Sequence, residues 1–68
     1  MHEITTTRPI LYPLPLSRHK SDHLNIPEQF LIPAASVLPV LEVLEDRVIA
    51  FYAPESCRVA LMDDEYHT

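Results

Sequence analysis

Residues 47–62, RVIAFYAPESCRVALM, decide the predicted fold. They form two apolar runs on either side of Pro54, and both runs are rich in the β-branched and aromatic residues typical of strands. Proline suits the second position of a type I turn, and Ser56 suits the exit from such a turn. The chain contains no glycine, which argues against a turn with positive φ. The stretch therefore predicts a β-hairpin with Pro54 in its turn.

The register of this hairpin follows from charge matching. If Ala53 lies opposite Cys57, Arg47 meets Asp63 as an opposite-charge pair at the open end. Side chains alternate across a strand. One face would then carry Ile49, Phe51, Cys57, Val59 and Leu61, and the other Val48, Ala50, Tyr52, Arg58, Ala60 and Met62. Both faces are mostly apolar, so we expect both to be covered, by the rest of the chain, by a second copy or by another partner.

The length of the chain, 68 residues, is that of one domain near the lower limit for unaided folding. A single cysteine excludes a disulfide framework, and no zinc-finger spacing is present, so oligomerisation or a stable partner is favoured. We predict an α+β fold with four parts: an extended proline-rich arm over 1–16, a polar loop over 17–25, a folded core over 26–63 and a frayed acidic tail over 64–68.

The stretch 36–45, SVLPVLEVLE, allows two interpretations. A helix is favoured, with Ser36 as N-cap and Pro39 in the first turn, because Glu42 and Glu45 then lie outside an apolar stripe. The alternative is a strand over 40–44 that extends the hairpin into a three-stranded meander, which the β-branched residues allow.

The stretch 9–16, PILYPLPL, contains three prolines, which exclude a helix and remove three backbone donors. Such a segment lies along the edge or across the face of a sheet. We favour a strap over the core of the same chain. The alternatives are an arm exchanged within a dimer and a ligand for the aromatic groove of another domain.

Charge and composition limit the classes of function that the chain could have. The formal net charge of −5 argues against non-specific binding to phosphate backbones. No apolar run is long enough to span a membrane and the first residues lack a signal-peptide pattern, so a cytoplasmic location is expected. Without glycine there is no phosphate-binding loop, and Cys57 is expected to be a buried, unreactive thiol. We therefore expect no enzymatic activity, no cofactor and no small-molecule substrate.

These observations predict a non-catalytic protein-binding module, such as a regulator, an inhibitor or an accessory subunit, that acts as a homodimer through the hairpin and the proline-rich arm. The residues expected at its interface are Leu11, Tyr12, Leu14, Val48, Tyr52, Arg58 and Met62.

Two alternatives remain open. The first is a small dimeric nucleic-acid-binding regulator of the antitoxin type, with Arg8, Arg18 and Lys20 as its contacts. The second is a metal-binding protein, because His19 and His23 are four residues apart and would share one face of a helix. Its third ligand would come from His2, Cys57 or His67.

Overall fold

The computed structural model describes residues 1–13 and 29–68, and strands are their main secondary structure. The strands are β1 (Glu3–Thr6), β2 (Ile10–Pro13), β3 (Gln29–Ile32), β4 (Val37–Val43), β5 (Arg47–Tyr52), β6 (Cys57–Met62) and β7 (Tyr66–His67). One 3₁₀ turn, η2 (Ala53–Glu55), joins β5 to β6. The predicted α+β class is therefore wrong: the described residues contain no α-helix. The predicted polar loop over 17–25 lies outside them.

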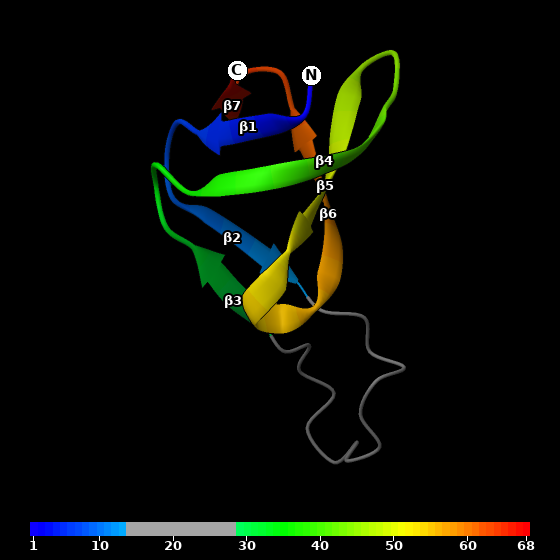
Figure 1. The fold of residues 1–68 in the computed structure, drawn as a ribbon. Coiled ribbons are helices and arrows are strands. Elements are labelled where there is room, and N and C mark those ends of the chain that lie inside the picture. The colour runs from blue at the N-terminus through cyan, green and yellow to red at the C-terminus, as the bar shows by residue number, and fades with distance from the viewer. Residues whose placement is uncertain (14–28) are drawn as a thin grey trace.

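Two antiparallel sheets enclose the core (Figure 1). Five strands form a curled sheet in the order β6-β5-β4-β1-β7, and β2 pairs only with β3. The buried apolar side chains come from both sheets: Ile4, Ile10, Ile32, Leu38, Val48, Ala50, Val59 and Leu61. The β2–β3 pair therefore covers the inner side of the larger sheet, and part of the predicted proline-rich arm covers the core of its own chain.

The hairpin of β5 and β6 has a register shifted by one residue from the predicted one. Tyr52, not Ala53, lies opposite Cys57. The difference arises in the turn, where Ser56 adopts a left-handed conformation with φ of 51° although it is not glycine. The loop therefore has four residues, and the two predicted faces exchange their β5 residues while keeping their β6 residues. Val48, predicted at an interface, lies in the core with 1% of its surface exposed.

The open end of the hairpin differs for the same reason. Arg47 lies opposite Met62 and not Asp63. Its guanidinium instead contacts the adjacent Asp46 at 3.2 Å. This exposed ion pair has a clear electrostatic effect: the hydrogen bond and charge of Arg47 lower the pKa of the Asp46 carboxyl.

The predicted helix over 36–45 is also wrong, because these residues contain strand β4. The first half of β4 pairs with β1 and its second half pairs with β5, with a register shift between Val40 and Glu42. The Val40 N–H donates to the His2 carbonyl at 2.9 Å. Backbone donors alternate in direction along a strand, so the Pro39 nitrogen is directed away from β1, at a point where the pairing with β5 has not begun. Pro39 therefore removes no ladder hydrogen bond.

The residues expected to fray at 64–68 turn back against the N-terminal strands. Tyr66 and His67 pair with β1. The Thr7 N–H donates to the Glu65 carbonyl at 3.0 Å. Arg8 donates to the Asp64 carbonyl at 2.9 Å and forms an ion pair with its carboxylate at 3.4 Å. The two ends of the described chain therefore lie side by side (Figure 1).

A buried threonine fixes the connection from β3 to β4. The Thr6 hydroxyl donates to the Pro33 carbonyl at 3.0 Å and accepts from the Ser36 N–H at 2.9 Å. The Thr6 backbone also exchanges hydrogen bonds with Ala35 and Ser36. These contacts hold Ala35 in a left-handed conformation with φ of 63°. Ser36, predicted as an N-cap, donates instead to the Pro33 carbonyl.

Candidate interaction face

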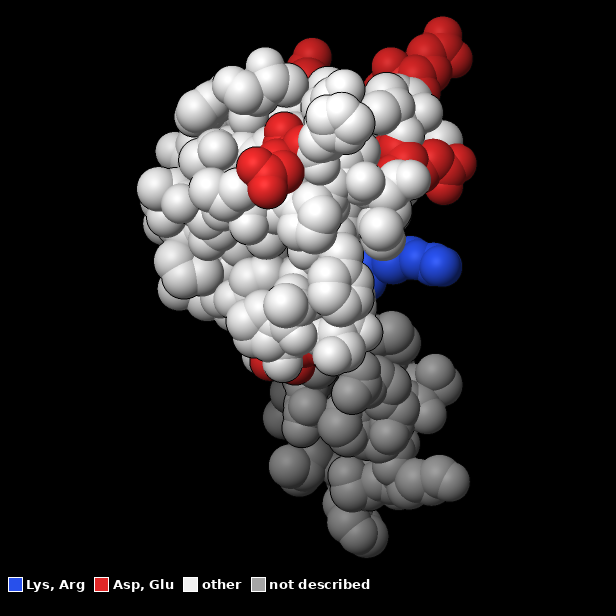
Figure 2. All heavy atoms as spheres, viewed as in Figure 1, with Lys and Arg blue, Asp and Glu red and all other residues white. Residues whose placement is uncertain are grey.

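The side of the β4–β5–β6 sheet that is turned away from the core is mostly apolar. We call it the outer face, and its apolar members are Val37, Pro39, Leu41, Ile49, Phe51, Ala60 and Met62. Ile49, Phe51 and Ala60 are half-buried, and the other four are exposed. In Figure 2 the side of the molecule with β4 in front is mostly uncharged. Glu3, on β1 opposite Pro39, is the acidic side chain near its middle, and other acidic side chains lie above, to the right and at the lower edge.

Phe51 is the centre of this face, because two shallow hollows meet at its ring. The first is lined by Leu41, Phe51 and Arg58, together with Tyr12 and Pro13 from β2. The second is lined by the first half of β4, by Phe51 and by the η2 turn. A half-buried aromatic ring between two hollows is the kind of anchor that carries binding energy in protein interfaces.

The bulge in β4 adds a further apolar side chain to the face. At the register shift, Val40 lies opposite Ala50 and Glu42 lies opposite Ile49. Leu41 therefore has no residue directly opposite it. Its side chain borders the same hollow as Phe51, with 51% of its surface exposed.

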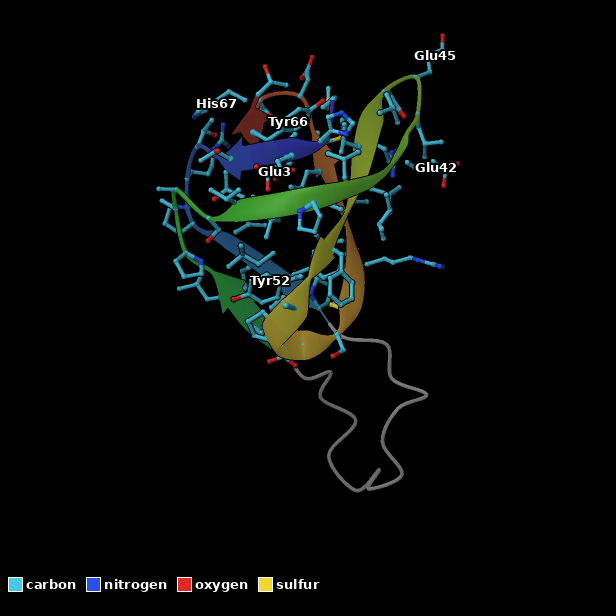
Figure 3. The ribbon with its side chains drawn as sticks, viewed as in Figure 1. Glu3, Glu42, Glu45, Tyr52, Tyr66 and His67 are labelled. Atoms are coloured by element: carbon cyan, nitrogen blue, oxygen red, sulfur yellow. The ribbon has the colours of Figure 1, made fainter. Side chains whose placement is uncertain are left out.

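Arg58 and Glu42 flank the apolar centre, and Arg47 lies on the same side of β5, opposite Met62. Arg58 lies on β6 opposite Phe51, and Glu42 lies on β4 opposite Ile49. Figure 3 shows Glu42 directed outward from the end of the sheet where β4 leads into β5. Within the described residues, Arg8 and Arg47 have carboxylate partners, whereas Arg58 and Glu42 form no ion pair.

The exposed edge of β6 is partly protected. The Ala60 N–H donates to the Tyr12 hydroxyl at 3.3 Å, and the Met62 N–H donates to the Glu65 carboxylate at 2.8 Å. These side chains occupy donors that an added strand would need. The face of the sheet is therefore more available to a partner than the β6 edge.

Three aromatic residues hold the two sheets together. The rings of Tyr12 and Phe30 lie 5.7 Å apart, and those of Phe30 and Tyr52 stack at 5.2 Å with an angle of 5° between their planes. The Tyr52 hydroxyl reaches the Leu31 carbonyl at 3.5 Å (Figure 3). Tyr12 and Tyr52, predicted at an interface, thus link parts of the same chain.

The structure divides the other predicted interface residues. Arg58 and Met62 lie on the outer face. Leu11 is exposed, but it lies opposite Leu31 on the separate β2–β3 pair. Val48 is in the core, and Leu14 lies outside the described residues.

The alternative sites fall largely outside the described residues. This applies to Arg18 and Lys20 of the nucleic-acid hypothesis, and to His19 and His23 of the metal hypothesis. Arg8 is described, and it is held by Asp64. Residues 1–13 and 29–68 contain no group of three potential metal ligands.

Sequence reasoning missed most of the outer face. The helix prediction includes Val37, Pro39 and Leu41, and the predicted register puts Ile49 and Phe51 on the same face as Val59 and Leu61. The signal that identifies the β4 residues is their spacing of two, which puts them on one side of a strand.

The chain matches no protein-family model, no curated protein and no solved structure. None of the described segments is a helix with the length and apolar character needed to cross a membrane.

Proposed function

We propose that this protein is a protein-binding module whose outer face docks on a partner protein. The observation that carries the proposal is the apolar surface that three adjacent strands leave uncovered within the described residues. Val37, Leu41 and Met62 are each about half exposed on it. A contiguous apolar surface with a charged margin is typical of interaction sites.

The composition of the face favours a protein over a nucleic acid. Its basic side chains among the described residues are Arg58 and Arg47, of which Arg47 is paired with Asp46, and Glu42 lies on the same side of the sheet. Nucleic-acid binding relies on several Lys and Arg contacts with phosphates, and the chain as a whole carries a net charge of −5. The absence of enzymatic activity and the cytoplasmic location stay predictions.

Phe51 is expected to be the principal contact. Interface energy is concentrated in a few central, well-packed residues, and aromatic residues are prominent among them. The hollows on both sides of the ring would receive apolar side chains of the partner. Arg58 and Glu42 would lie at the rim, where charges contribute more to specificity than to affinity.

Site-specific photo-cross-linking tests this proposal. A photoreactive phenylalanine analogue replaces Phe51 in cells that naturally produce the chain, and the control variant carries it at Leu31, which is 56% exposed on the other sheet. We expect defined protein adducts from position 51 and not from position 31. Leu41→Asp should abolish the adducts, whereas Leu11→Asp should not. Equal labelling at both positions, or labelling insensitive to Leu41→Asp, would refute the proposed docking face.

A further inference from the structure

Two charges of the outer face that form no ion pair within the described residues, Glu42 and Arg58, lie on opposite margins of the three-stranded surface. Glu42 is on β4 in the row of Ile49 and Ala60, and Arg58 is on β6 in the next row, with Phe51. Successive side chains on one face of a strand are about 6–7 Å apart. The charges are therefore separated by the full width of β5 but by only one step along the strands.

From this placement we infer that the partner is a second copy of the chain, bound face to face about a two-fold axis parallel to β5. This inference rests on the proposed function. The axis exchanges the positions of β4 and β6 and leaves β5 over the partner's β5. Arg58 of each copy then lies over β4 of the other copy, one step along the strand from the partner's Glu42. Because both side chains are long, they can span this distance and form an ion pair.

Symmetry makes this pairing occur twice. In a two-fold interface, a contact from Arg58 to the partner's Glu42 is repeated by the reciprocal contact. A two-fold axis across the strands would instead leave β4 over the partner's β4, so both Glu42 side chains would share one margin and both Arg58 side chains the other, which like-charge repulsion disfavours. The axis parallel to β5 brings the two Arg47 side chains near each other, but each is held by its own Asp46 at 3.2 Å. The pairs of Glu42 with Arg58 therefore decide the orientation of the two copies.

The apolar residues agree with the same arrangement. An axis parallel to β5 brings the Phe51 rings of the two copies together, with Ile49 beside them. Both residues are half-buried in the single chain and would lose further contact with water. Sheets that pack face to face with nearly aligned strands form a core of this kind. A chain of 68 residues buries a smaller share of its surface on folding than a larger domain does, so an added apolar contact stabilises it.

A reciprocal charge exchange tests the inference with purified protein. Sedimentation equilibrium should show a dimer for the wild-type chain. Glu42→Arg places two arginines together, and Arg58→Glu places two glutamates together, so each variant should associate about tenfold or more weakly. An equimolar mixture of the two variants restores both opposite-charge pairs and should recover the dimer. Circular dichroism checks that each variant keeps its strand content.

Three outcomes would overturn the second-copy inference: a wild-type chain that stays monomeric up to about 1 mM, single variants that dimerise like the wild type, or a mixture that does not reassociate. The proposed function fails separately. If cross-linking at position 51 yields adducts with a different protein and the purified chain is monomeric, protein binding stands and the second copy is excluded. If position 51 yields no specific adduct, the docking face itself is excluded.

Discussion

At the scale of single residues, the chain adopts left-handed backbone conformations without glycine. Ala35 and Ser56 are the described residues with positive φ, at 63° and 51°. For residues with a Cβ atom this conformation costs roughly 1–2 kcal/mol. Thr6 supports the first position through the Pro33–Ser36 turn. At Ser56, the conformation is stabilised by a 3.0 Å hydrogen bond from the Ser56 N–H to the Ala53 carbonyl.

We expect Ala35→Gly to stabilise the protein. Glycine removes the Cβ clash, and the greater freedom of the unfolded chain offsets part of that gain, so the net increase in the free energy of unfolding should be about 0.5–1 kcal/mol. Urea denaturation measures the change. Ala34→Gly is the matched control: Ala34 has no positive φ to relieve, and its replacement should destabilise the protein. Equal effects of the two substitutions would contradict the assigned conformation.

At the scale of elements, the sequence predicts the hairpin over 47–62 but not its register. The error arises from one residue, because a left-handed Ser56 lengthens the loop, and residue type alone gave no reason to expect it. The strand β4 is misassigned for a different reason. Its apolar residues fit a helical stripe and a strand face about equally, and Pro39 suits the first turn of a helix as well as a strand position without a ladder donor. Only the pairing of β4 with β1 and β5 distinguishes these readings.

The corrected register separates core residues from outer-face residues, and mutations can show this. Leu61→Ala should lower the free energy of unfolding by about 2–5 kcal/mol, because Leu61 is fully buried and its loss leaves a cavity. Phe51→Ala should cost clearly less, since Phe51 is half-buried on the outer face, but it should weaken self-association. Urea denaturation at low protein concentration and sedimentation equilibrium measure the two effects. If Phe51→Ala lowered the free energy of unfolding more than Leu61→Ala, the result would contradict the observed register.

At the scale of the whole molecule, the sheet depends on contacts between distant parts of the chain. Strand β1 pairs with β4 on one side and with β7, near the other end of the chain, on the other. A local sequence pattern cannot predict such pairings, because any strand can form backbone hydrogen bonds with the free edge of any other strand. For this reason the sequence predicted a two-sided apolar hairpin and a need for cover, but not which face β2 and β3 would cover.

The docked C-terminal residues give a test at this scale. Deleting residues 64–68 removes β7 and the backbone acceptors of Thr7, together with the Glu65 carboxylate that accepts from the Met62 N–H. Because each hydrogen bond is worth about 0.5–1.5 kcal/mol, we expect a loss of about 2–4 kcal/mol in the free energy of unfolding. Arg8→Gln is the control: the ion pair of Arg8 with Asp64 is exposed, so its removal should cost less than about 1 kcal/mol. If the truncated chain unfolds at the same urea concentration as the full chain, these residues are not part of the sheet in solution.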